Sequence, residues 1–435
     1  MFDKLKQSRL IKNVSWLFFG NILHAILSFL LNVYVARKVT LDANGLLNYA
    51  LSIITFFTSI GTLGFNATIT RNFSLDIDKH NTYLWTGMIS RFIFSVICMI
   101  VLQTFICLNN PNDLILQGIV FCQSFSLLFG SFDLLIYWFR YQNKADITIY
   151  TKLLAFIISA TWRIISISFF DSVILYSFGL SLETILYVLL LIHIYRKTYD
   201  KKIQFSFLDF KSMIRISYPF IFSAMLTTIY GQMDKIMLKN MVGNTAVALY
   251  AVSTTLAGLV VIIPTTLIEG FRPDIMESKV KNEELYQRRL SQLYAIVFWI
   301  CIAYGILITI FSKQILSLLY GEKYLAASTS LSIIVWYTSF SYFGAINNVY
   351  MVAENKSKWV QLTTLVGAIL NFILNFIFIP YFQIEGAAMA SLLTQIITNF
   401  VMMYLIKDLR KGFKIMVRGI FLKKNIMNLE SMKEK

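Results

Sequence analysis

Twelve stretches, each of about 20 mostly apolar residues, constrain the fold of this 435-residue chain more than any other feature. A helix of about 20 apolar residues can cross a lipid bilayer, because it satisfies its own backbone polar groups. The stretches lie at 16–34, 46–65, 84–107, 114–138, 149–169, 173–194, 218–238, 247–268, 293–318, 331–352, 360–380 and 387–406. We therefore predict an all-α integral membrane protein with about twelve transmembrane helices.

The charged residues are few and unevenly placed. Only 14% of the chain is charged, against about 25% in a typical soluble protein, which excludes a soluble enzyme. With the N-terminus in the cytoplasm, 30 of the 39 Lys and Arg residues fall in cytoplasmic segments and five in outer loops. The positive-inside rule therefore predicts that both termini are cytoplasmic, and the net charge of +16 indicates loops facing anionic lipid rather than a nucleic-acid partner.

A central polar stretch divides the chain into two halves of six spans each. We predict an N-terminal lobe at 1–196, a cytoplasmic linker at 197–212, a C-terminal lobe at 213–406 and a basic cytoplasmic tail at 407–435. Residues 35–50 and 238–251 resemble each other, and both join the first and second spans of their half. An even number of spans gives the halves the same orientation, so we expect a parallel repeat with a binding site between the lobes.

The sequence contains no recognisable catalytic, nucleotide-binding or metal-binding motif. It has no glycine-rich phosphate loop and no Ser/His/Asp arrangement, and its four cysteines lie in or beside apolar spans without metal-ligand spacing. We expect no catalytic residues, no cofactor and no metal site, so any pumping must use an ion gradient or the substrate's own gradient.

Four groups of landmark residues occur in order along the chain. They are Ala36-Arg37 with Gly45, Tyr49, Gly61 and Gly64-Phe65; Asp133 with Trp138-Phe139-Arg140; Ser217-Tyr218-Pro219 with Asp234 to Leu238, Gly243 and Leu249-Tyr250-Ala251; and Asn371, Asn375, Ile379-Pro380 and Gly386-Ala387-Ala388. In these the chain resembles the polysaccharide repeat-unit flippases of the multidrug/oligosaccharidyl-lipid/polysaccharide exporter superfamily. It departs from them at Arg140-Tyr141-Gln142, where the family's usual glycine is missing.

The resemblance implies a V-shaped, alternating-access transporter of the bacterial cytoplasmic membrane. Its implied cargo is an undecaprenyl-diphosphate-linked oligosaccharide, moved to the outer leaflet for O-antigen, capsule or another surface polysaccharide. Implied partners are H⁺ or Na⁺ as coupling ion, membrane lipids, and polysaccharide polymerase and chain-length proteins. Two alternatives stay open: an ion-coupled multidrug antiporter of the same superfamily, and a membrane glycan polymerase or ligase.

Four basic residues inside the spans are candidates for binding an anionic cargo: Arg91, Lys152, Arg163 and Lys235. A charge in the bilayer costs several kcal/mol and normally faces a cavity or a partner. Lys152 and Arg163 are eleven residues apart and so share one helix face, which suits a diphosphate. Alternatively, Lys152 extends to the membrane surface and Arg163 pairs with an acid such as Glu183.

Five further residues are candidates for ion coupling or gating: His24, Asp133, Glu183, Asp234 and Glu269. His24 is either a proton switch or a hydrogen-bonding partner of a neighbouring helix. Asp234 either couples to an ion or forms an interhelical salt bridge. Asp133 and Glu269 lie near helix ends, where we expect ion pairs with Arg140 and Arg272.

Three polar or helix-breaking features complete the predictions. Asn371 and Asn375, one turn apart, are expected to hydrogen-bond between helices. Pro264 is expected to kink its span, as a fixed bend or as a hinge. The tail at 407–435 forms either an amphipathic helix on the inner membrane surface or a disordered basic segment.

Overall fold

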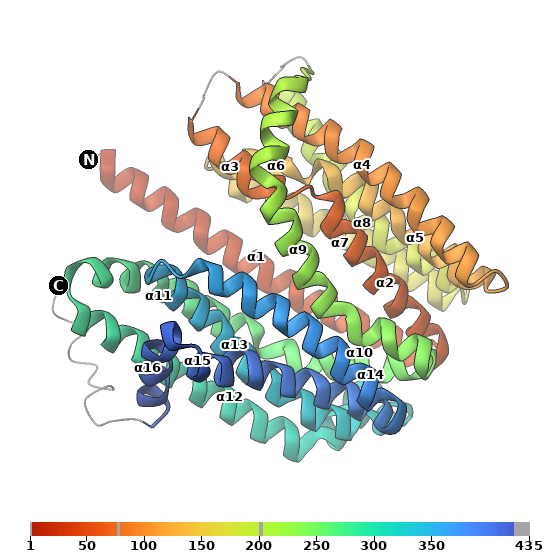
Figure 1. The fold of residues 1–435 in the computed structure, drawn as a ribbon. Coiled ribbons are helices and arrows are strands. Elements are labelled where there is room, and N and C mark those ends of the chain that lie inside the picture. Colours follow the sequence, from red (N-terminus) through yellow and green to blue (C-terminus); the bar gives the residue numbers. More distant parts are fainter. Residues whose placement is uncertain (1, 76–78, 200–202, 422–435) are drawn as a thin grey trace. The chain divides into compact units, whose positions relative to one another are not determined.

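The computed structural model describes residues 2–75, 79–199 and 203–421, and Figure 1 shows that helices account for nearly all of them. No strand occurs in these ranges. The all-α prediction is confirmed. The chain divides into two compact units, residues 1–232 and 233–435.

The first unit contains the helices from the N-terminus to α8. Their bounds are α1 Phe2–Lys38, α2 Leu41–Gly61, α3 Phe65–Leu75, α4 His80–Asn109, α5 Leu114–Gly130, the 3-10 turn η1 Ser131–Asp133, α6 Leu134–Tyr141, α7 Ala145–Ser168 and α8 Val173–Tyr199. The next helix, α9 (Phe207–Met241), contributes to both units, because the division falls after Gln232.

The second unit continues from the end of α9. Its elements are α10 Asn244–Ala257, η2 Gly258–Val261, α11 Ile262–Lys281, α12 Glu283–Tyr320, η3 Glu322–Ala327, α13 Ser328–Ala353, α14 Ser357–Ile396, the π-helical turn η4 Ile397–Val401, α15 Met402–Leu405, η5 Lys407–Leu409 and α16 Arg410–Ile420. The expected kink near Pro264 coincides with the 3-10 turn η2, which interrupts the span just before α11.

Ten helical segments of the described chain are long and apolar enough to cross a membrane. The last of them, Ser357–Leu405, holds two of the predicted spans, because the chain turns back at Gln383 with non-helical φ 48° and ψ −121°. Across this hairpin, Asn371 donates to Ser391 Oγ at 3.2 Å. The remaining predicted span corresponds to α13, which is less apolar.

The surface of these helices is apolar where lipid would cover it. On α4, Ile93, Ile97 and Ile100 recur every three or four residues and are 54%, 49% and 61% exposed. In water such a face would drive aggregation, but in a bilayer it matches the surrounding hydrocarbon. The chain is therefore a multi-pass membrane protein.

One helix in each unit ends in the same backbone conformation, a similarity that the sequence resemblance of 35–50 and 238–251 does not include. After α6, Asn143 has φ 56° and the Lys144 amide donates to Phe139 O at 2.9 Å. After α13, Asn355 also has φ 56° and the Lys356 amide donates to Met351 O at 2.7 Å. Asn tolerates this left-handed conformation better than most residues, which explains its place at both endings. The same ending after the fourth predicted span of each half supports the parallel repeat.

Candidate functional site

The charged side chains inside the spans form three separate buried clusters among the described residues, two in the first unit and one in the second. We name them the Arg163 cluster (His24, Ser159, Arg163, Glu183), the Arg91 cluster (Asn66, Arg91, Gly130, Asp133) and the Asp234 cluster (Asp234, Tyr250, Asn371, Asn375, Ser391).

In the Arg163 cluster, one carboxylate is shared between an arginine and a histidine. Arg163 on α7 donates through Nη2 to Ser159 Oγ at 3.0 Å and to Glu183 Oε2 on α8. The other carboxylate oxygen of Glu183 lies 2.8 Å from His24 Nε2 on α1. The structure thus contains both the Arg163–Glu183 pair and the hydrogen bond from His24 to a neighbouring helix, each given as an alternative above.

Close packing positions this arginine. Its guanidinium carbon lies 5.8 Å from the centre of the Phe156 ring, which also packs edge-on against the ring of His24. On α8, a Cβ at Gly179 would lie 2.6 Å from Arg163 Cγ, so only glycine leaves room for the arginine stem. The Arg163 side chain is 4% exposed but its Glu183 partner is 20% exposed, so the carboxylate is the accessible member of the pair.

The Arg91 cluster has the same design. Arg91 on α4 donates through Nη1 to Asp133 Oδ1 at 2.8 Å and to Asn66 Oδ1 at 3.3 Å, and through Nη2 to Gly130 O at 3.3 Å. Its side chain is 2% exposed and that of Asp133 is 35% exposed. In each of these two clusters, a buried arginine is therefore paired with a more exposed carboxylate.

The predicted partner of Asp133 was wrong. Arg140 lies seven residues further along the chain, about two helical turns or 10 Å away along the axis, and packs over the Tyr137 ring at 5.9 Å. Asp133 pairs instead with Arg91. The other expected pair is present: Arg272 donates to Glu269 at 2.6 and 3.0 Å, on the exposed side of α11.

Buried donors remain unsatisfied in both arginine clusters. Neither Arg91 Nε nor Arg163 Nε has a hydrogen-bond partner among the described residues, although both atoms are buried. A buried N–H without an acceptor costs about 1–3 kcal/mol, and more for a charged group. Such donors are expected where an external acceptor binds.

The Asp234 cluster lies in the second unit and has a different character. Asp234, near the end of α9, accepts hydrogen bonds from Asn375 Nδ2 at 2.6 Å, from Ser391 Oγ at 2.6 Å and from the Tyr250 hydroxyl. Asn375 also donates to Asn371 Oδ1 at 3.1 Å, which accounts for the predicted hydrogen bonding of the two asparagines.

Among the described residues, no cationic side chain forms a hydrogen bond or ion pair with this buried carboxylate. Asp234 is 8% exposed, and within the described ranges only neutral groups bind it. The oxygen Asn375 Oδ1 is buried in the same cluster and accepts no hydrogen bond from any described residue. The arrangement offers a proton or a small cation several oxygen atoms, as hard cations prefer.

The two predicted lysines stand apart from these clusters. Lys152 on α7 is half-buried and interacts electrostatically with Glu183, so it adds positive charge to the surroundings of the Arg163 cluster. Lys235 is half-buried beside Asp234 but forms no hydrogen bond or ion pair with another described residue.

A fourth charged cluster, at the helix ends of the second unit, was not predicted. Lys279 Nζ lies 2.9 Å from Glu283 and 2.6 Å from Glu354, and Lys411 Nζ lies 2.5 Å from Glu283 and 3.4 Å from Glu354. We call these four residues the ion-pair ring. It connects α11, α12, α16 and the end of α13. Burial raises the pKa of Glu354, but Lys279 and Lys411 lower it by more, so its pKa lies below the ordinary value.

Two family models match the chain. The model described as polysaccharide biosynthesis protein matches residues 10–269, and the MatE model matches residues 219–377. The capsular polysaccharide biosynthesis protein CapF of Staphylococcus aureus is 24% identical over 419 residues, which is 92% of this chain and 99% of CapF. The lipid II flippase MurJ of Bacillus subtilis is 24% identical over 217 residues, 46% of this chain and 39% of MurJ.

Solved transporters share the fold. The inward closed conformation of the lipid II flippase MurJ gives a TM-score of 0.74 at 15% identity, covering 93% of this chain and 91% of that one. An inward-facing MATE family multidrug transporter gives a TM-score of 0.65 at 14% identity, covering 89% and 96%. Since the polysaccharide biosynthesis model matches more than half of its residues, the chain belongs to the polysaccharide biosynthesis protein family, within the multidrug/oligosaccharidyl-lipid/polysaccharide exporter superfamily.

Proposed function

We propose that the chain is a flippase for a lipid-linked oligosaccharide. The cargo is an undecaprenyl-diphosphate-linked repeat unit, moved from the inner to the outer leaflet of the bacterial cytoplasmic membrane by alternating access. The product serves O-antigen, capsule or another surface polysaccharide. The family, and a capsule biosynthesis relative matched over almost its whole length, support this proposal.

The buried arginines carry the proposal. Arg91 and Arg163 each have an Nε–H inside a membrane span that no described residue accepts, although both arginines are already paired with a carboxylate. A diphosphate has enough oxygens to accept hydrogen bonds from both Nε and Nη of one guanidinium. The carboxylate partners, Glu183 and Asp133, accept only from Nη. The cargo is moved without covalent change, so neither arginine is a catalytic residue.

Cargo binding is then an exchange of counter-ions. The diphosphate takes the guanidinium of Arg163, and Glu183 moves away and keeps its contact with His24. The freed carboxylate, with an imidazole at 2.8 Å, is suited to take up a proton. At the other cluster, Asp133 gives up Arg91 in the same way. Lys152 and Lys235 add positive charge for the phosphate or for acidic sugars.

Ion coupling is assigned to the Asp234 cluster. A buried carboxylate with neutral partners is easily neutralised by H⁺ or Na⁺, and its charge state would alter the hydrogen bonds that join α9, α10 and both arms of α14. Neutralisation of Asp234 thus affects the packing of the second unit. Glu269 and Arg272, paired on α11, are a gating pair in this scheme.

The two alternatives have less support. A cation antiporter favours an acidic and aromatic chamber, whereas the deepest charges of the first unit are arginines. A polymerase or ligase usually carries a large outer loop, whereas the connections between described helices are short.

The proposal is tested in a strain that depends on this chain for its surface polysaccharide. Deletion is expected to accumulate the lipid-linked repeat unit on the inner leaflet. The Arg91→Ala and Arg163→Ala variants, at wild-type protein level, are expected to restore less than a tenth of export. Lys313→Ala, which removes an exposed charge, is the matched control and is expected to restore export fully. Normal export by both arginine variants would contradict the proposal.

A further inference from the structure

The helix α16 follows the last transmembrane helix and carries three distinct faces. It begins five residues after Leu405, where α15 ends, so it lies at the level of a membrane surface. One face is buried against the second unit and consists of Gly412, Ile415, Met416 and Gly419. Residues 410–420 of the predicted tail are therefore helical, while residues 422–435 lie outside the described part.

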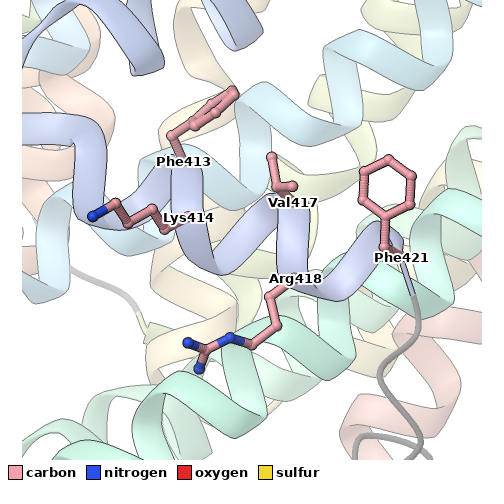
Figure 2. Close-up of a pocket in the computed structure, with 5 residues that line it drawn as sticks. All are labelled: Phe413, Lys414, Val417, Arg418 and Phe421. Carbon is pink, nitrogen blue, oxygen red and sulfur yellow. The ribbon is translucent and has the colours of Figure 1, made fainter.

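Outside this buried face, two stripes run along the helix with a spacing of four residues. Phe413, Val417 and Phe421 form an apolar stripe, and Figure 2 shows their side chains projecting to the same side of the helix. Phe413 is partly covered, because its ring packs against Phe400 and Tyr404. Arg410, Lys414 and Arg418 form a basic stripe beside it. Residues four apart lie one above the other on a helix, so each stripe is continuous.

Arg410 at the start of the basic stripe donates to Tyr404 O at 3.0 Å, but the other two charges of the stripe have no partner among the described residues. Lys414 and Arg418 are exposed and have no hydrogen bond or ion pair to any residue in the described ranges, whereas Lys411, on the inner side, belongs to the ion-pair ring. No acidic residue occurs from 409 to 421. Lys414 and Arg418, with the apolar stripe, line a hollow of about 320 Å³ (Figure 2).

We propose that this hollow and the basic stripe form a binding site for an anionic phospholipid. The phosphate lies against Lys414 and Arg418, and the upper part of an acyl chain lies along Val417 and Phe421. An apolar stripe next to a basic one is how a helix lies in the interface of an anionic membrane. The site is separate from the transport clusters, and it does not depend on the cargo proposed above.

Residues 422–435 are the other candidate occupant of the hollow, and their charge argues against them. Residues 422–435 contain four Lys and two Glu, so the segment is net positive and is repelled by the basic stripe. A lipid phosphate is attracted by the same stripe. The site therefore selects an anionic lipid over the tail.

The test uses the purified full-length protein in neutral detergent. Phosphatidylglycerol or phosphatidylcholine is added, and the melting temperature is followed against lipid concentration. For the wild type, phosphatidylglycerol is expected to raise the melting temperature and phosphatidylcholine is not. In Lys414→Gln/Arg418→Gln, the half-saturating phosphatidylglycerol concentration is expected to rise about tenfold, since each basic residue contributes a severalfold effect at an anionic surface.

Three controls make the result decisive. Lys38→Gln/Lys313→Gln removes two exposed charges elsewhere and is expected to respond as the wild type. Equal responses of the two double variants would overturn the proposal. So would an equal rise in melting temperature with inorganic phosphate, which would indicate a free anion. Loss of the lipid effect in Ile426→Ser/Leu429→Ser would indicate that the tail makes the site, and would also overturn it.

Discussion

At the scale of single residues, two arginines are buried among the helices of the first unit, and each is paired with a carboxylate. Arg91 and Arg163 are almost fully buried, and their carboxylate partners are several times more exposed. An accessible carboxylate gives no added stability to a purely structural ion pair. In the proposed binding site it has a use, because the carboxylate must leave the arginine when the cargo arrives.

Variants of the Arg163–Glu183 pair can show whether the pair serves stability, transport or both. Glu183→Leu leaves a buried guanidinium without its carboxylate and is expected to lower stability by about 3 kcal/mol or less, since Glu183 is partly exposed. Arg163→Leu/Glu183→Leu removes both charges and is expected to recover most of that loss. Melting temperatures check this order, and export assays are expected to show that neither variant transports. Export by the double variant would assign the pair a structural role only.

Sequence reasoning finds the buried charges but not all their partners. Arg163, Glu183 and His24 are recognisable because charged or titratable residues are rare within apolar spans. Tyr250 and Ser391 are not, since hydroxyl residues are common in membrane helices and carry no signal of their own. Ser391 binds Asp234 across 157 residues of chain, a contact that only tertiary packing decides.

At the scale of helices, hydropathy predicts the spans and fails at the details of their ends. Hydropathy separates the spans at 360–380 and 387–406 but does not locate the turn between them at Gln383. The left-handed conformation of Asn143 depends on local backbone geometry that an apolar window does not register. The packing of α16 against the second unit is also not predictable from the sequence. Two glycines allow it: a Cβ at Gly412 would lie 2.6 Å from Tyr350 Cε1, and one at Gly419 would lie 2.5 Å from Ser291 O.

Gly419→Ala tests this close packing. The added methyl group meets backbone, which cannot move aside easily, so we expect a loss of stability of about 1–3 kcal/mol. Gly270→Ala on α11 is the matched control, because a Cβ there meets no atom within 4 Å and is expected to stabilise the helix by about 0.5–1 kcal/mol. Thermal unfolding of the two variants gives the comparison, and equal effects would show that α16 is not docked as described.

The ion-pair ring predicts a pH dependence. The pKa of Glu354 is lowered in the folded state, so its contribution to stability is complete above the ordinary carboxyl pKa of about 4.3 and is lost as pH falls through the lowered value. Glu354→Gln is therefore expected to lower the melting temperature at pH 7 and to flatten its decline below pH 4. Glu284→Gln, at an exposed carboxylate near the ring, is expected to leave that decline unchanged.

At the scale of the whole molecule, the two units divide the tasks that the proposed function requires. The first unit holds both buried arginines, and the second holds a buried carboxylate surrounded by neutral groups. The helix endings at Asn143 and Asn355 occur at equivalent places in the two units, as a parallel repeat predicts. In the proposed function, the first unit binds the anionic cargo and the second binds the coupling ion.

The measurement that tests this account most directly is leaflet exchange in reconstituted vesicles. A fluorescent diphosphate-linked oligosaccharide is placed in the vesicles, and the fraction reaching the outer leaflet is followed with a membrane-impermeant quencher under an ion gradient. Wild type and Lys313→Ala are expected to expose the lipid at least tenfold faster than protein-free vesicles, and Arg91→Ala/Arg163→Ala no faster than those vesicles. Equal exposure by the wild type and the arginine double variant would contradict the central claim.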